Sequence, residues 1–179
     1  MLATSLFALA ALSGFAITAP TSGCTAEQRL YYSNQVIVAY AATTPSLTYT
    51  TFNNIPFGVP DLNGPCETVI LPDGGPPVPV GVTGNGVVNF GTATRQAFSK
   101  VTGQYVDFPQ NGTTLINTNV TLGIRSGIPI PITFRGYVFL DFTADCRISA
   151  VRAYAKIPTE VLGLAINLSG GLPYIPLPI

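Results

Sequence analysis

The chain has 179 residues, of which 47% are hydrophobic and only 9% are charged, with eight basic side chains balancing eight acidic ones. Soluble domains carry about a quarter charged residues, so uncharged polar side chains must cover much of this surface, and without a basic excess nucleic acid is not an expected partner. The sequence contains no histidine. Its absence removes the commonest general base, the commonest metal ligand and every Ser–His or Cys–His pair, so we expect no metal site and no cofactor.

The N-terminal segment is typical of a secretory signal peptide. An apolar run over residues 6–12 is followed by small residues up to Ala19, and the run is too short for a membrane span. We therefore expect a signal peptide at residues 1–19, a domain at residues 20–156, and an apolar, Pro-rich tail at residues 157–179. The tail is expected to pack on the domain, so that the mature protein is secreted without stable membrane insertion.

Three sequons of the form Asn-X-Ser/Thr are compatible with secretion. They begin at Asn111, Asn119 and Asn167, and each is a candidate glycosylation site. Asn111 precedes Gly112 in a predicted turn, and Asn119 lies on the polar face of a predicted strand, so both side chains should face solvent.

Three cysteines follow the signal peptide, at Cys24, Cys66 and Cys146, and none has the short spacing of a zinc or redox motif. One disulfide and one free thiol are expected in an oxidising compartment. A strand over residues 47–52 that runs back along the first helix would return the chain toward Cys24. This arrangement favours a Cys24–Cys66 disulfide and leaves Cys146 free in a turn.

The first predicted elements are a helix and a short strand. Thr25-Ala26-Glu27-Gln28 is a capping box, and no Gly or Pro interrupts a helix over residues 25–42. Pro45 should end that helix, and the Thr, Tyr and Phe content of residues 47–52 favours a strand. Residues 53–86 are dense in Pro and Gly, so they are expected to form a long irregular insertion with one brief strand at 68–71.

A second helix is predicted over residues 92–105. At the spacing of a helical wheel, Val101 and Tyr105 fall on one side, whereas Arg95 and Lys100 fall opposite.

The remainder of the domain is predicted as antiparallel sheet. Residues 113–124 alternate between apolar and polar side chains, and strands are also expected over residues 130–143 and 148–155. Turns at residues 126–127 and 144–146 join them. Helices and strands that are segregated in this way indicate an α+β fold.

Several short motifs resemble a known superfamily. The helix region from Gly91 to Phe98, the run Phe-Thr-Ala-Asp-Cys-Arg-Ile over residues 142–148, and Val-Arg-Ala-Tyr over residues 151–154 together resemble the SnoaL-like and ketosteroid-isomerase superfamily. That superfamily shares the cone-shaped fold of nuclear transport factor 2, and its turn has Gly where this chain has Cys146. The resemblance covers roughly residues 25–155 and implies a curved antiparallel sheet wrapped around helices, with an apolar pocket between them. A lipocalin-like β-barrel is the alternative fold.

The resemblance does not extend to the chemistry of the isomerases. Their general base would fall on Ile55, and the carboxylic acid of the long strand would fall on Val138. Neither side chain exchanges a proton. Only the tyrosine of the first helix has a possible counterpart, either Tyr31 or Tyr32. Because the positions of the base and the acid are apolar, the isomerase mechanism is excluded.

Strand parity predicts which side chains line the pocket. Alternate residues of a strand face the same side of the sheet, so the apolar face of each strand should point toward the helices, and Tyr31 or Tyr32 should supply a polar tip. The expected lining residues are Tyr31, Tyr32, Ile116, Val120, Leu122, Val138, Leu140, Val151 and Ala153. Asp141 has the opposite parity and should pair with Arg135 or Arg152, whereas Asp107 is expected to be a capping or turn residue. No catalytic residue is assigned.

These features favour a secreted protein that binds a small hydrophobic ligand, such as a lipid or a polyketide, in an apolar pocket. Two alternatives remain open. One is an enzyme of the cyclase, dehydratase or epoxide-hydrolase kind that uses Tyr and Asp in place of His. The other is a non-catalytic extracellular interaction protein whose pocket is filled by its own side chains. The sequence also leaves a homodimer open.

Overall fold

The computed structural model describes residues 23–73, 75–124 and 128–156. The expected signal peptide at 1–19, the turn at 126–127, the tail at 157–179 and the sequon at Asn167 lie outside these residues. The elements in chain order are α1 (Ala26–Ala41), α2 (Pro45–Asn53), β1 (Pro65–Pro72), β2 (Val78–Thr83), α3 (Gly84–Thr94), a 3-10 turn (Arg95–Ala97), β3 (Phe98–Phe108), β4 (Thr113–Ile124), β5 (Ile128–Phe142) and β6 (Ile148–Ala155).

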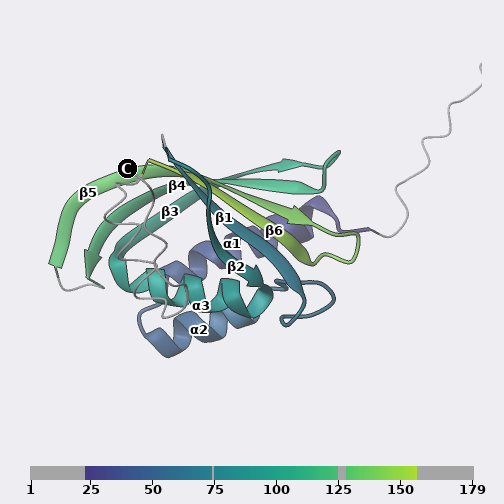
Figure 1. Ribbon diagram of the computed structural model, residues 1–179, viewed down its shortest axis with the longest axis horizontal. Coiled ribbons are helices and arrows are strands. Elements are labelled where there is room, and N and C mark those ends of the chain that lie inside the picture. The colour runs from purple at the N-terminus through teal and green to yellow at the C-terminus, as the bar shows by residue number, and fades with distance from the viewer. Residues whose placement is uncertain (1–22, 74, 125–127, 157–179) are drawn as a thin grey trace, which may run out of the picture.

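The strands form one curved, open sheet in the order β2-β1-β6-β5-β4-β3. Figure 1 shows this sheet as one layer, with α1, α2 and α3 together on the side around which β5 bends. The α+β fold with a curved sheet wrapped around helices is therefore confirmed. The lipocalin-like barrel is wrong, because the edge strands β2 and β3 do not pair with each other.

The expectation of a purely antiparallel sheet is wrong at one place. β1 runs parallel to β6, whereas every other neighbouring pair of strands is antiparallel. Only strands joined by a tight turn are forced to be antiparallel. β1 and β6 are separated by most of the domain, so no such turn constrains their direction.

Helix α1 begins at the predicted capping box. The Thr25 Oγ1 accepts a hydrogen bond from the Gln28 backbone N–H at 3.3 Å, and the Gln28 Oε1 accepts one from the Thr25 N–H at 2.9 Å. Two N–H groups that the first helical turn leaves without a backbone partner are thereby satisfied. The prediction of this helix is confirmed, with bounds one residue inside those expected at each end.

The strand predicted over residues 47–52 is wrong, because this segment is helix α2. Thr44 caps the helix through its side chain, which accepts from the Leu47 N–H at 3.2 Å, and Pro45 occupies the first turn. Proline suits that position, because the first N–H groups of a helix have no backbone partner and proline has no N–H there to leave unpaired. Thr48 and Phe52 are buried four residues apart on one side of the helix, so packing overrides their strand propensity.

The helix predicted over residues 92–105 is also wrong over most of its length, since the chain enters β3 at Phe98. Val101 is buried and Tyr105 half-buried, and both lie on the helix side of the sheet. Their spacing of four residues fits a helix and a strand equally well, because four is both about one helical turn and two strand repeats. The helical wheel could not separate these two cases.

Gly103 is a point of close contact between helix α1 and this strand. It lies between Val101 and Tyr105, and a Cβ there would be 2.8 Å from the Ile116 Cγ2 and 2.9 Å from the Ile37 Cγ1. Atoms do not approach so closely without displacement, so the missing side chain lets α1 pack directly against β3.

The segment over residues 53–86 is far more regular than expected. It contains β1 and β2 and the first residues of α3, and its main irregular part runs over residues 54–64. The Arg147 guanidinium holds this loop by donating to the Phe57 carbonyl oxygen at 2.8 Å and to the Gly58 carbonyl oxygen. Gly58 itself has a φ of 79°, a conformation that glycine adopts at little cost.

The disulfide predicted between Cys24 and Cys66 is wrong. Cys24 is bonded to Cys146, and Cys66 is a buried free thiol in β1. Because residues 47–52 form a helix, they do not return the chain to the start of α1. The turn between β5 and β6 lies there instead, and the Cys24 backbone N–H donates to the Ala144 carbonyl oxygen at 2.9 Å.

Candidate functional site: an apolar cavity

A row of small residues crosses the sheet on its helix side. Gly103, Thr118, Gly136 and Ala155 are register partners on β3, β4, β5 and β6. Protein interiors are densely packed, so short side chains leave space unless a facing helix fills it. Ile37 fills the space at Gly103. Beyond that point a cavity remains between the sheet and the helices.

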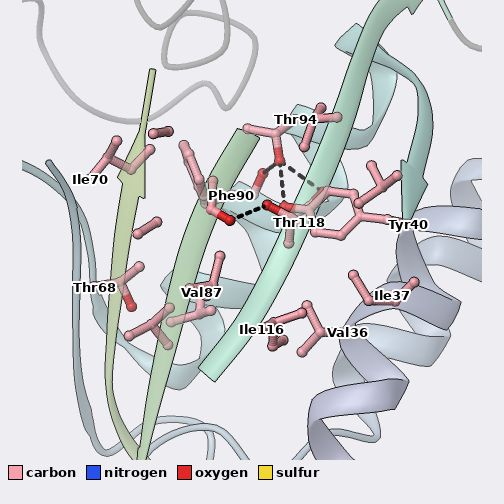
Figure 2. A pocket seen from close by; sticks show the side chains of 18 of the residues that line it. Val36, Ile37, Tyr40, Thr68, Ile70, Val87, Phe90, Thr94, Ile116 and Thr118 are labelled. Atoms are coloured by element: carbon pink, nitrogen blue, oxygen red, sulfur yellow. Dashed lines mark hydrogen bonds between the residues drawn. The ribbon is translucent and has the colours of Figure 1, made fainter. Parts of the chain in front are cut away.

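The cavity has a volume of about 140 Å³ and is partly open to solvent. An engineered apolar cavity of about 150 Å³ holds benzene, so this space fits a molecule built around one ring. Polar atoms form only a small share of the wall. The side chains contributed by the helices are Val36, Ile37, Tyr40, Phe52, Val87, Phe90 and Thr94; Figure 2 shows several of them facing the strands.

Six of the predicted lining residues lie on the cavity wall, namely Ile116, Val120, Val138, Leu140, Val151 and Ala153. Their positions follow from the register: Ile116 pairs with Val138, and Val138 pairs with Ala153. The parity of β4, β5 and β6 was therefore assigned correctly. Asn119, on the other face of β4, is exposed, as this parity requires.

The predicted residues Leu122, Tyr31 and Tyr32 do not line the cavity. Leu122 is buried in a neighbouring cluster with Val101. The Tyr31 side chain is 58% exposed and its ring meets the Tyr32 ring edge-on, 5.3 Å between centroids. Tyr32 is partly buried but packs beside the cavity rather than on its wall.

Tyr40 is the tyrosine that sequence reasoning missed. The inward side of α1 carries Arg29, Ser33, Val36 and Tyr40, which are spaced by four, three and four residues. Residues at this spacing share one helix face. The same spacing, followed along the sequence from Arg29, leads to Tyr40 and leaves Tyr31 on the outer side of the helix.

The Tyr40 hydroxyl lies 3.1 Å from the Thr94 Oγ1, which is also bonded to the Phe90 carbonyl oxygen at 2.9 Å (Figure 2). Burial raises the pKa of the Tyr40 phenol, and its hydrogen bond to Thr94 only partly opposes this effect. Tyr40 is therefore a neutral hydroxyl at physiological pH.

The described charged side chains stay off the cavity wall, although the buried Arg95 guanidinium, which donates to the Phe98 and Ala42 carbonyl oxygens, is close enough to Tyr40 to oppose part of the rise in its pKa. No carboxylate, ammonium or guanidinium group is among the described residues that line it. Asp141 points to the outer face, where Arg152 donates to both of its carboxylate oxygens at 2.7 and 2.8 Å, which confirms one of the two partners predicted for it. The isomerase base position, Ile55, is fully buried, and Val138 is part of the apolar wall.

The prediction that Asp107 is a capping or turn residue is wrong. Asp107 lies in β3 and belongs to a buried ion pair. The Arg29 Nε and Nη2 donate to its two carboxylate oxygens at 2.8 and 2.7 Å, and Thr114 donates to one of them at 3.2 Å. The Arg29 and Asp107 side chains are only 6% and 9% exposed. The hydrogen bond from Arg29 lowers the pKa of Asp107, so this carboxylate stays ionised in the folded protein.

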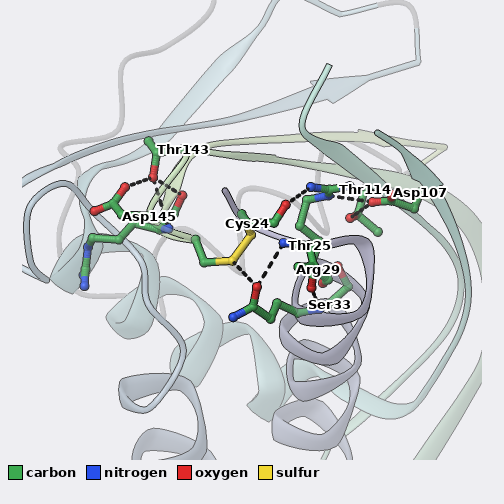
Figure 3. The surroundings of a disulfide bond; sticks show 11 residues. Cys24, Thr25, Arg29, Ser33, Asp107, Thr114, Thr143 and Asp145 are labelled. Atoms are coloured by element: carbon green, nitrogen blue, oxygen red, sulfur yellow. Dashed lines mark hydrogen bonds and ion pairs between the residues drawn. A yellow bond between two sulfur atoms is a disulfide. The ribbon is translucent and has the colours of Figure 1, made fainter. Parts of the chain in front are cut away.

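This ion pair and the disulfide form one cluster at the start of α1. Arg29 also donates to the Cys24 carbonyl oxygen, and Ser33 donates to the Arg29 carbonyl oxygen at 2.8 Å (Figure 3). The cluster ties α1 to β3 and to the turn between β5 and β6. It supports one end of the helix whose other end carries Tyr40.

Neither a metal site nor a reactive thiol is found among the described residues. Within the described ranges, no group of three or more Cys, Asp or Glu side chains could hold a metal ion. Burial raises the pKa of the Cys66 thiol, so this cysteine has little of the thiolate character that reactive cysteines need.

Among the helices described, none has the length and apolar character needed to cross a membrane.

No family model and no curated protein matches the sequence. Solved structures do resemble the fold. They include a steroid delta-isomerase from Pseudomonas aeruginosa, with 12% identity and a TM-score of 0.49 over 80% of this chain and 89% of that one. The pinacolase BvnE from Penicillium brevicompactum shows 11% identity and a TM-score of 0.47, over 88% and 99% of the two chains. A SnoaL-like family protein from Agrobacterium tumefaciens shows 14% identity and a TM-score of 0.44, over 72% and 97%.

The structural neighbours include SnoaL-like and ketosteroid isomerase-like proteins, the group that the sequence motifs resemble. At identities this low, the similarity describes the arrangement of helices and strands. It gives no information on whether this chain shares the reactions of those proteins.

Proposed function

We propose that this protein binds a small hydrophobic molecule in the cavity and releases it unchanged. The observation that carries the proposal is the composition of the wall: apolar side chains surround about 140 Å³ of space, with a few hydroxyl groups as the polar contacts from side chains. Such a wall favours an apolar ligand through burial of its surface.

Binding without turnover follows from the same wall. General acid–base catalysis needs a group whose pKa lies near the working pH and that reaches the substrate. The chain has no histidine, and Asp141 and Asp107 are both held in ion pairs away from the cavity. The enzyme alternative would depend on Tyr40, whose raised pKa makes it a poor base at neutral pH.

Toluene is a suitable probe for this proposal, because it matches the size of the cavity. At a concentration ten times its Kd, we expect toluene to raise the Tm by about 4 °C through preferential binding to the folded state. The substitution Ala153→Leu should abolish the shift, since Ala153 lies on the wall and a leucine there would fill the space. Differential scanning calorimetry measures both effects.

Ala150→Leu is the matched control, on the same strand but absent from the cavity wall. It should keep the toluene-dependent shift. An equal shift in all three proteins, or no shift in the wild type, would contradict the proposal. Turnover of a co-purifying molecule by the wild type, lost in Tyr40→Phe, would support the enzyme alternative instead.

We also propose that the protein is secreted after removal of residues 1–19. A disulfide is the bond expected in an oxidising compartment, and Cys24 lies just beyond the proposed signal peptide.

Expression through a eukaryotic secretory pathway should add N-linked glycans at Asn111 and Asn119, because both side chains are exposed. Intact-mass measurement before and after enzymatic deglycosylation tests this expectation. Asn111→Gln and Asn119→Gln should each remove one glycan, and an unchanged glycan mass in either variant would show that the site is unused.

A further inference from the structure

The threonine hydroxyls in the sheet part of the cavity wall each donate their proton to a backbone carbonyl oxygen. The Thr118 Oγ1, in the row of small residues, donates to the Gly136 carbonyl oxygen at 3.1 Å. The Thr68 Oγ1 donates to the Cys66 carbonyl oxygen at 3.4 Å. A hydroxyl has one proton and two acceptor lone pairs, so each of these groups can still accept a hydrogen bond but has none left to donate.

The same count holds for the pair on the helix side. The Thr94 Oγ1 donates to helix carbonyl oxygens, that of Phe90 at 2.9 Å or that of Gly91 at 3.1 Å. The contact of 3.1 Å between Thr94 and Tyr40 then has Tyr40 as its donor. The Tyr40 oxygen keeps its lone pairs, while its proton points at Thr94 and away from a ligand.

No other side chain on the described wall supplies a donor. The strands β1, β6, β5 and β4 each have a partner strand on both sides, so their backbone N–H groups lie in the plane of the sheet within its ladders. The Tyr154 side chain belongs to the outer face, where its ring meets the Phe139 ring edge-on, and the residue is 41% exposed. No cationic side chain is among the described wall residues, and the nearby Arg95 guanidinium donates to the Phe98 and Ala42 carbonyl oxygens.

From this count we propose that the cavity selects an apolar molecule that carries one hydrogen-bond donor, such as a phenol or an alcohol. Tyr40 and Thr118 accept the hydrogen bond from its hydroxyl. An aldehyde or ketone of equal size presents only an acceptor and would face acceptor oxygens, whereas a carboxylate would enter without a counter-charge. This inference deepens the proposed function and rests on it.

Three probes with the same number of non-hydrogen atoms separate the two proposals: p-cresol, p-xylene and benzaldehyde. Isothermal titration calorimetry gives a Kd for each with the wild type and with the variant Tyr40→Phe/Thr118→Val. We expect the variant to raise the Kd of p-cresol about tenfold, because a net hydrogen bond is lost. The Kd of p-xylene should not rise, and that of benzaldehyde should stay equal or fall.

Thr121→Val is the matched control, since Thr121 lies on β4 but bonds Thr133 on the outer face. It should leave all three Kd values unchanged. A rise for benzaldehyde as large as that for p-cresol would show that the wall donates, and equal changes for p-cresol and p-xylene would show that the hydroxyls do not contact the ligand; either result overturns the inference while leaving the cavity a binding site. Failure of all three probes to bind the wild type would overturn the proposed function itself.

Discussion

Removal of the Cys24–Cys146 disulfide is expected to lower the free energy of unfolding by about 5 kcal/mol. The bond joins residues 122 positions apart, and a crosslink over that length removes much of the entropy of the unfolded chain. Denaturant titration of the variant Cys24→Ser/Cys146→Ser against the wild type measures the loss. Reductant should destabilise the wild type and leave the variant unchanged.

The residue placed at position 146 also affects the free energy of unfolding, through the backbone conformation that it must adopt. Cys146 has a φ of 62°, in the left-handed region where glycine is favoured. In a Cys24→Ser background, Cys146→Gly should therefore be about 1 kcal/mol more stable than Cys146→Ser. A wild type that is no more stable than these variants in the absence of reductant would show that the crosslink contributes nothing.

The substitution Arg29→Met is expected to lower the free energy of unfolding by about 3–5 kcal/mol. It leaves the Asp107 carboxylate buried without its cation, and a single buried charge is far more costly than a buried pair. The double variant Arg29→Met/Asp107→Leu should recover most of the loss. Arg152→Met is the control: it breaks a more exposed pair, with side chains 42% and 28% exposed, and should cost no more than about 1 kcal/mol.

The same pair predicts how stability depends on pH. The pKa of Asp107 is lower in the folded state than its ordinary value of about 3.9. The stabilisation is therefore fully present above pH 4 and is lost as the pH falls through the folded-state pKa. Acid titrations of stability should show a smaller loss below pH 4 in Arg29→Met/Asp107→Leu than in the wild type. An identical acid limb in the two proteins would show that Asp107 does not carry the effect.

The sequence predicts most accurately where one pattern excludes the others. The capping box at Thr25 permits only a helix start, and the long alternation over residues 113–124 permits only a strand. The two segments whose helix or strand type was wrong, residues 47–52 and 92–105, lie where local signals are ambiguous. Val101 and Tyr105 fit both repeats. A proline such as Pro45 is found both after the end of a helix and in the first turn of the next, and here it is the first residue of α2.

The cavity could be predicted on its strand side, but its helix side and its size could not. Parity places Val138 and Ala153 on the wall from the sequence alone. The space itself depends on register, which aligns Gly136 with Thr118 and Ala155 across three strands. Register is a long-range property, so no single segment reveals that these small residues meet.

The buried thiol of Cys66 has a consequence for how the chain acquires its disulfide. In the unfolded chain, the loop between Cys24 and Cys66 is roughly a third as long as the native loop, so loop-closure entropy favours it by about 1 kcal/mol. Oxidation before folding is therefore expected to form the Cys24–Cys66 pair more often than the native one. A third thiol allows that error to be corrected by exchange. Once β1 joins the sheet, burial of Cys66 and the raised pKa of its thiol protect the native disulfide from attack by this cysteine.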